Sequence, residues 1–136
     1  MSTAADLKPI PFLIGGEWVQ DTSSHITHVN PATGEVNYQV CAGTETDIDL
    51  AVNSAHQAAR QPAWRNMLPH QRAQILNRIA ELMIERSDLL ARCQMLENGK
   101  VWKECKNQVI NGAATFRYCA AAIETLGSEI TPPRGN

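Results

Sequence analysis

Two spacings of apolar residues divide the chain, and the first is that of short β-strands. The apolar run over 12–14 is followed by Gly15-Gly16 and then by an amphipathic run that starts at Glu17-Trp18. A pair of glycines readily takes the positive φ angles of a tight turn, so we expect a hairpin with Leu13-Ile14 folded back on Glu17-Trp18. So small a ribbon is not stable by itself and must lie against a larger body.

A second pair of extended segments follows the hairpin. Ile26 to Val29 leads into Asn30-Pro31, where the proline excludes its predecessor from the helical region. The segment "NPATG" is a turn, because Pro31 suits its second position and Gly34 can take the left-handed conformation. Beyond the turn, apolar residues alternate at Val36, Tyr38, Val40 and Ala42. The pattern predicts a β-meander over residues 12–43.

From Thr44 onwards the apolar residues recur at helical spacing. The segment "TETD" places a hydroxyl three residues before a carboxylate, which is typical of a capping box at a helix start. The first predicted helix continues until Pro62, with an apolar stripe at Ile48, Val52, Ala55 and Ala59. A second helix is predicted from Pro69, because proline is tolerated in a first turn. Its inner face is expected to hold Ile75, Leu76, Ile79, Leu82 and Met83.

Two further helices complete the pattern. Ser87 and Asp88 can cap a short third helix, and Asn98-Gly99 stops it. A fourth helix follows, and Gly127 stands where its cap is expected. The apolar positions of the third helix are Leu89, Leu90, Cys93 and Leu96, and those of the fourth are Val109, Ala113, Phe116, Ala120 and Ile123.

Strands followed by helices indicate an α+β fold. We expect a flexible N-terminus over 1–11, a β-meander over 12–43, a helical layer over 44–127 and a C-terminal tail over 128–136. Every predicted helix has a wide apolar face, and burying one Leu or Ile side chain contributes about 1.5–3 kcal/mol. Four helices and one ribbon are too few to cover these faces, which predicts a large packing partner.

Composition and charge exclude several classes of protein. The 136 residues are 43% hydrophobic and 19% charged, which is typical of a globular domain. The chain has 12 Lys plus Arg against 14 Asp plus Glu and no basic run, so neither nucleic acid nor a membrane surface is expected as a partner. No segment has the roughly 20 apolar residues of a membrane span, and the first residues lack a secretory signal. A cytoplasmic protein is therefore expected.

The cysteines and histidines have no catalytic context in the sequence. The cysteines lack C-x-x-C spacing and fall on predicted strands or helices, so reduced and mostly buried packing residues are expected. They are Cys41, Cys93, Cys105 and Cys119. The first two histidines lie three apart on extended chain and are expected at the surface, and the other two are isolated and are expected to be solvated or partly buried. They are His25, His28, His56 and His70.

The segment "LENGK" surrounds the predicted end of the third helix. In one interpretation Gly99 ends the helix while Lys100 contacts its terminal carbonyls. In the other, Glu97 helps to hold a cation. The residues by themselves indicate a cytoplasmic α+β protein without catalytic machinery.

Six segments, taken in this order, resemble the N-terminal segment of the NAD(P)-dependent aldehyde dehydrogenase superfamily over 12–133. They are "FLIGGEWV", "VNPATGEV", "TETDIDLAVNSAHQAA", "LPHQRAQILNRIAELMIER", "LENGK" and "FRYCAAAIETLGSEITP". The resemblance implies that the strands lie on the outside of the family's coenzyme-binding domain and that the helices pack beside its nucleotide-binding sheet. The chain would then be a fragment or truncated product of a parent with the family's α/β fold.

The resemblance also implies a function for that parent. It would oxidise a small-molecule aldehyde to a carboxylic acid through a cysteine thiohemiacetal, with hydride transfer to NAD or NADP, as a homo-oligomer, either dimer or tetramer. The family's catalytic cysteine, general base and glycine-rich turn come later in family chains. No catalytic or cofactor-binding residue is therefore expected here, and the chain alone is expected to be inactive and to bind no nucleotide.

Two smaller implications concern residues of this chain. Some family members hold a structural monovalent cation at the positions that match Val29 and Glu97. The helix that matches 104–126 borders the substrate entrance in the family, so Asn107, Asn111 and Ala114 are expected to line it. Cys119 departs from the family pattern, which often has a second aromatic residue there. The alternative to an enzyme segment is a non-catalytic helical module that associates with itself or with a full-length relative.

Overall fold

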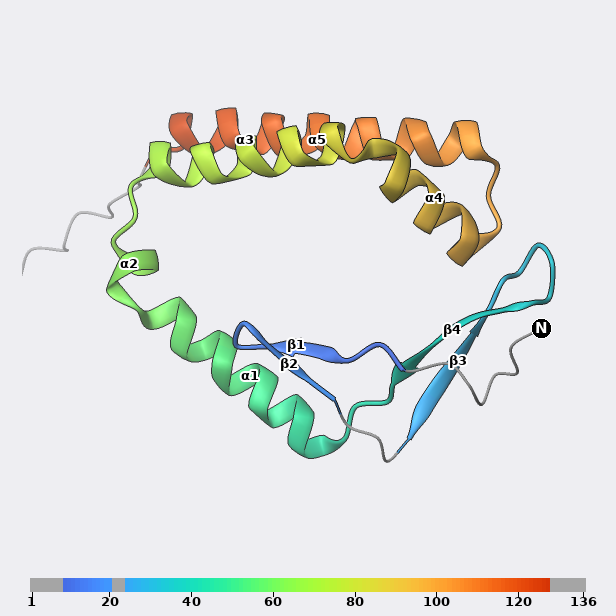
Figure 1. The fold of residues 1–136 in the computed structure, drawn as a ribbon. Coiled ribbons are helices and arrows are strands. Elements are labelled where there is room, and N and C mark those ends of the chain that lie inside the picture. The colour runs from blue at the N-terminus through green and yellow to red at the C-terminus, as the bar shows by residue number, and fades with distance from the viewer. Residues whose placement is uncertain (1–8, 21–23, 128–136) are drawn as a thin grey trace, which may run out of the picture.

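The computed structural model describes residues 9–20 and 24–127, and these form an open arc of strands followed by helices (Figure 1). The strands are β1 (Phe12–Ile14), β2 (Glu17–Val19), β3 (His25–Val29) and β4 (Val36–Cys41). The helices are α1 (Glu45–Arg60), α2 (Pro62–Arg65), α3 (Pro69–Glu85), α4 (Ser87–Asn98) and α5 (Trp102–Thr125). The order of elements is that of the predicted α+β fragment. The predicted tail over 128–136 and residues 1–8 of the predicted flexible N-terminus lie outside the described residues.

The predicted first hairpin is confirmed. β1 and β2 pair antiparallel with Ile14 opposite Glu17, and the loop has φ angles of 63° at Gly15 and 89° at Gly16. Both angles are positive, which is why this loop needs glycine. The hairpin lies against α1, where a Cβ on Gly15 would come within 3.1 Å of Ser54 Oγ. The body that supports this small ribbon is therefore α1.

The four strands do not form the single β-meander that the sequence pattern predicts. Among the described residues, β1 pairs with β2 and β3 pairs with β4 in two separate sheets. Ile10 takes the outer edge of β4, where its amide donates to Gln39 O at 2.9 Å and its carbonyl accepts from Cys41 N at 3.1 Å. Because this edge is filled and the first hairpin turns onto α1, the two hairpins stay separate.

α1 begins as predicted, and a short helix that the apolar spacing does not predict follows it. Thr44 Oγ1 accepts from the Asp47 amide at 3.3 Å, and Asp47 Oδ2 accepts from the Thr44 amide at 2.9 Å, which completes a capping box. α1 ends at Arg60, and Pro62 becomes the first residue of α2. Proline cannot continue α1 but suits the first turn of a helix, so Pro62 starts α2 shortly after α1 ends.

α3 and α5 lie side by side along most of their length (Figure 1). The buried residues at this contact are small, namely Ala73 and Ala80 from α3 and Ala113 and Ala120 from α5. The side chains at a helix contact set the distance between the axes, so alanines allow a close approach. Ile75, predicted on the inner face of α3, is instead 41% exposed, because the alanines occupy the line of contact.

α4 follows α3 almost without a break, and the predicted cap at Ser87 and Asp88 is wrong. Only Arg86 separates the two helices, and its amide still donates to Leu82 O at 3.0 Å. The first amides of α4 therefore lie close to the last turn of α3. The Ser87 hydroxyl and the Asp88 carboxylate accept hydrogen bonds from Lys106 Nζ on α5 instead.

The sequence predicts the buried residues near the start of α5 better than the residue at which the helix ends. Near its start, Cys105 and Val109 form a small core with Ala91 of α4. At its end, the cap is Leu126 in an extended conformation with φ of −67°, and Gly127 is not the predicted cap. The apolar spacing thus locates the buried face of α5 correctly but not its last residue.

Large apolar side chains remain exposed on every long helix. α1 contains no buried residue, and Ile48 and Val52 on its predicted apolar stripe are 60% and 61% exposed. The largest fully buried side chain among the described residues is that of Cys105. None of the helices in the described part of the chain combines the length and the hydrophobicity of a membrane span.

Ala113→Leu tests the seam of small residues between α3 and α5. Ala113 is fully buried, so the larger side chain is expected to force the helices apart and to lower the free energy of unfolding by about 1–3 kcal/mol. Ala114→Leu is the matched control, because Ala114 is exposed and its substitution should change stability by less than about 0.5 kcal/mol. Urea denaturation followed by circular dichroism measures both effects. Equal effects of the two substitutions would contradict close packing of α3 against α5 through small residues.

Candidate functional site

Polar side chains of the β3–β4 hairpin meet the carboxyl end of α4. Tyr38 Oη donates to Glu97 Oε1 at 2.8 Å, and Asn37 Nδ2 donates to Leu96 O at 2.7 Å. His28 Nε2 lies 3.2 Å from Glu97 O, where it can donate. We call these five residues the α4–hairpin junction. It joins segments 59 to 69 residues apart in the sequence, and it is where the β3–β4 hairpin is hydrogen-bonded to α4.

The pairing of β3 with β4 explains why these side chains converge. His28 is opposite Tyr38 and Val29 is opposite Val36, so Asn37 is the extra residue of a bulge. A bulge redirects side chains, which lets Asn37 reach the same side as its neighbour Tyr38. The rings of His28 and Tyr38 stack with centroids 4.8 Å apart and an interplanar angle of 10°.

The hydrogen bonds at His28 select one tautomer. Asn37 Nδ2 lies 3.2 Å from His28 Nδ1 and also donates to Leu96 O. An amide NH₂ has donors only, so Nδ1 is the acceptor and Nε2 carries the proton that faces Glu97 O. His28 was predicted as a surface histidine, but it is half-buried because it links the hairpin to α4.

α4 ends at this junction because of Gly99. The C-cap Gly99 has φ of 70°, as predicted for a helix stop, and a Cβ on it would come within 3.0 Å of Pro31 Cγ. The interpretation in which Lys100 contacts the terminal carbonyls is wrong. Lys100 Nζ donates to Gln108 Oε1 on α5 at 3.3 Å, while the carbonyls are satisfied by the hairpin.

The electrostatics of the junction are dominated by an acidic group without a basic partner. Burial raises the pKa of Tyr38, and the hydrogen bond to Glu97 and its negative charge raise it further. Within residues 9–20 and 24–127, no ion pair joins Glu97 to Lys, Arg or His. The nearest lysine in sequence, Lys100, lies 4.0 Å from Glu104 instead.

One of the two predicted cation ligands, Glu97, is part of the junction, and the other, Val29, is the neighbour in sequence of the junction residue His28. Val29 follows His28 at the end of β3, and the His28 ring contacts the carbonyl of Glu97. Glu97 offers carboxylate oxygen, and Val29 offers a main-chain carbonyl. No group of three or more His, Cys, Asp or Glu side chains suited to a metal ion occurs in the described part of the chain.

The three predicted entrance residues lie on one exposed face of α5. Asn107, Asn111 and Ala114 are all exposed, and at about 100° per residue they lie opposite the buried face of the helix. Tyr118 continues the same stripe and is 74% exposed. The spacing of i, i+4, i+7 and i+11 is visible in the sequence and could have identified Tyr118 as a fourth member.

Two of the four cysteines are not the buried packing residues that the sequence predicts. Cys41 and Cys105 are buried, whereas Cys93 and Cys119 are exposed. Cys119 is exposed because the line of contact with α3 passes through the adjacent Ala120. The other histidines are exposed as predicted, and they are His25, His56 and His70.

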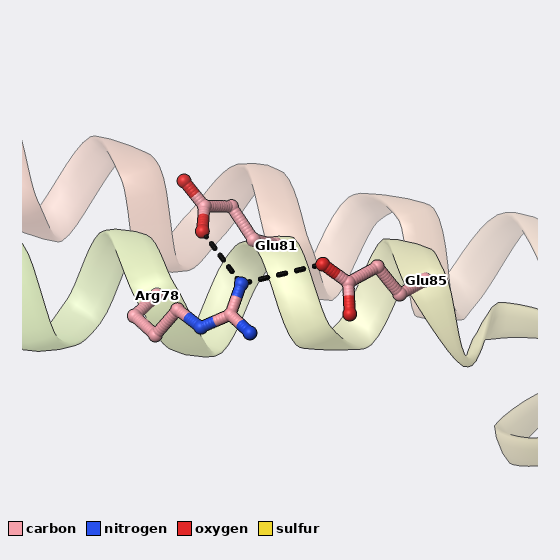
Figure 2. Close-up of polar contacts among 3 residues, drawn as sticks. All are labelled: Arg78, Glu81 and Glu85. Atoms are coloured by element: carbon pink, nitrogen blue, oxygen red, sulfur yellow. Dashed lines mark hydrogen bonds and ion pairs between the residues drawn. The ribbon is translucent and has the colours of Figure 1, made fainter.

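A second charged group lies on the outer face of α3. Figure 2 shows Arg78 between Glu81 and Glu85, with Nη1 to carboxylate distances of 2.9 Å and 3.3 Å. The hydrogen bond to Glu81, followed by the interactions with Glu85, raises the pKa of Arg78. All three side chains are more than half exposed, and such pairs contribute little to stability. This group is a solvated helix surface rather than a site.

Comparison with known proteins gives a consistent set of relatives. The chain matches the model of the aldehyde dehydrogenase family over residues 18–136. It is 38% identical over 120 residues to malonate-semialdehyde dehydrogenase 2 of Bacillus mycoides, which covers 88% of this chain and 24% of that protein. It is also 38% identical to phenylacetaldehyde dehydrogenase of Pseudomonas fluorescens, with 90% of this chain and 25% of that protein covered.

The solved structures agree with the sequence relatives. The fold is similar, with a TM-score of 0.84, to a crystal structure of a point mutant of betaine aldehyde dehydrogenase from Staphylococcus aureus in complex with NAD+. The two chains are 28% identical, and the match covers 92% of this chain and 26% of that one. The chain thus spans about a quarter of the length of the relatives that it matches.

The pH dependence of stability tests the hydrogen bond at Tyr38. A raised pKa in the folded state means that Tyr38 contributes stability below its unfolded pKa of about 10 and loses that contribution as the pH rises through the folded value. Tyr38→Phe is therefore expected to cost about 1 kcal/mol at neutral pH and less above about pH 10. Denaturation at several pH values measures this, with Tyr118→Phe as control. Parallel curves for Tyr38→Phe and the parent chain would contradict the expectation.

Proposed function

This chain belongs to the aldehyde dehydrogenase family, and we propose that it forms the N-terminal quarter of an enzyme that oxidises an aldehyde to a carboxylic acid with hydride transfer to NAD or NADP. The observation that carries the proposal is the agreement of fold and sequence over one continuous segment. A TM-score of 0.84 over 92% of the chain goes together with 38% identity to named dehydrogenases.

The chemistry requires groups that we do not assign to this segment. A cysteine thiolate adds to the aldehyde carbonyl, the resulting thiohemiacetal transfers hydride to the nicotinamide, and water then hydrolyses the thioester to the acid. Cys41 and Cys105 are buried and so cannot reach a substrate. Cys93 and Cys119 lie in the middle of helices, away from a helix N-terminus that would favour the thiolate. The chain alone is therefore proposed to be inactive.

We propose that the exposed face of α5 borders the substrate entrance of the assembled enzyme. Asn107, Asn111 and Ala114 point away from the contacts with α3 and α4, so packing within the described chain does not use them. An exposed stripe of small and polar side chains on a long helix is available to a substrate path. The remaining walls would come from the other three quarters of the family fold.

We propose a structural monovalent cation at the α4–hairpin junction, held by Glu97 and the carbonyl of Val29. The residues fit such an ion, because Glu97 is an acidic group without an ion-pair partner in the described residues. It also lies at the negative end of the dipole of α4. One carboxylate with neutral oxygen ligands balances a single positive charge better than a double one. The ion would hold the carboxyl end of α4 against the hairpin.

The exposed apolar residues favour association as a second property of the isolated chain. Ile48 and Val52 on α1 are more than half exposed, and contiguous apolar patches of this kind are typical of interaction surfaces. We propose that the rest of the family fold covers them in the assembled enzyme. The alternative function, a non-catalytic module that pairs with itself or with a full-length relative, would use the same faces.

The isolated 136-residue chain is expected to associate and not to bind NAD. Light scattering should show oligomers, and calorimetric titration should show no binding of NAD. Val52→Asp should reduce association because it places a charge on the exposed apolar stripe of α1. Asn53→Asp is the matched control, since it adds the same charge at an exposed polar position and should leave association unchanged. A monomer that binds NAD at micromolar concentration would contradict this expectation.

A chimera tests the enzymatic proposal. The segment of the Bacillus mycoides malonate-semialdehyde dehydrogenase that this chain matches is replaced by this chain, and aldehyde-dependent formation of NADH is measured. The chimera is expected to oxidise aldehydes, because this chain is 38% identical to the segment that it replaces. A folded chimera that binds NAD but oxidises no aldehyde would argue for the interaction module.

A further inference from the structure

The hydrogen-bond partner of the Glu97 carboxylate is a neutral hydroxyl from a distant strand. Tyr38 Oη donates to Glu97 Oε1 at 2.8 Å across 59 residues of sequence. Within the described ranges, Glu97 Oε2 makes no hydrogen bond and no ion pair. One oxygen is thus fixed in place while the other keeps its capacity to accept.

The main chain around Glu97 is fixed in the same way. The carbonyls of Leu96 and Glu97 face Asn37 Nδ2 and His28 Nε2, both of which are neutral donors in the tautomer that the hydrogen bonds select. These contacts satisfy the last carbonyls of α4 but do not balance negative charge. The negative charge of the carboxylate and the partial negative charge at the end of the helix dipole therefore lie together at the carboxyl end of α4.

We propose that Tyr38 is a positioning residue for cation binding by Glu97, and this rests on the cation site given under the proposed function. The hydroxyl of Tyr38 orients the carboxylate so that Oε2 and its charge are presented to a monovalent cation. A tyrosine suits this role because its hydroxyl is neutral and does not compete with the cation as Lys or Arg would. Groups that orient a ligand in this way typically change metal affinity by about 10–100-fold.

The pairing of β3 with β4 places Tyr38 opposite His28. The Tyr38 ring stacks on His28 while its hydroxyl donates to Glu97, so the ring is held by two contacts. The stacked ring has little rotational freedom left to lose when the cation binds. Glu97 at the end of a helix, by contrast, would sample several rotamers without its partner. The energetic effect of Tyr38 is therefore expected on cation affinity as well as on stability.

The test measures thermal unfolding of the full 136-residue chain as NaCl or KCl replaces choline chloride at constant ionic strength. A cation that binds only the folded chain raises the unfolding temperature with concentration. The parent chain is expected to respond, and Glu97→Gln is expected to abolish the response. Tyr38→Phe should need about 10–100-fold more cation for the same shift. Tyr118→Phe, an exposed tyrosine outside the junction, should behave like the parent.

Two further variants separate positioning from a purely structural role. In the Glu97→Gln background no cation response is left, so adding Tyr38→Phe there measures only the purely structural contribution of the Tyr38 side chain to stability. Should Tyr38→Phe not fold, Glu97→Asp replaces it, since the charge is kept but the shorter side chain moves away from Tyr38 Oη. It too should need about 10–100-fold more cation.

Three outcomes would overturn the proposal. They are an unchanged cation requirement in Tyr38→Phe, an unchanged requirement in Glu97→Asp where that variant is used, and a parent chain that does not respond to either cation. The last outcome would remove the proposed cation site as well. None of them would touch the proposal of aldehyde oxidation, which the chimera tests through NADH formation.

Discussion

The hydrogen bonds between the β3–β4 hairpin and the carboxyl end of α4 are the constraint on which the arrangement of the strands and helices depends. Tyr38, Asn37 and His28 each contact the last turn of α4, and Gly99 packs against Pro31 at the turn that follows. Each hydrogen bond contributes about 0.5–1.5 kcal/mol. Because α4 continues almost directly from α3, fixing its end also fixes the direction of the long helix before it.

The helices themselves are held by small residues rather than by a large apolar core. Alanines form the contact between α3 and α5, and Cys105 is the largest fully buried side chain in the described chain. Larger residues such as Ile48 and Leu89 remain more than half exposed. A single hydrophobic core normally places such side chains inside, so this distribution is what one layer of a larger fold has before the adjacent layer covers it.

Local features were predictable from the sequence, and contacts between distant segments were not. The Gly15-Gly16 hairpin, the capping box at Thr44 and the stop at Gly99 follow from a few adjacent residues, and all three are present. The Tyr38 to Glu97 hydrogen bond joins residues 59 apart and depends on a bulge that periodicity does not show. The hydrogen-bond partner of Lys100 could not be predicted for the same reason. Only the tertiary fold determines whether its side chain contacts the carbonyls of α4 or Gln108.

The junction and the proposed entrance face are mechanically linked through the short connection between α4 and α5. Gly99 sets the direction in which the chain leaves α4, and Lys100 then bonds to Gln108 within α5. Cys105 and Val109 pack on Ala91 just beyond this connection, which fixes the rotation of α5 about its axis. Since Asn107 and Asn111 lie opposite that buried face, their direction follows from the same packing. A change that releases Glu97 from the hairpin is therefore expected also to loosen the start of the helix that carries the proposed entrance residues.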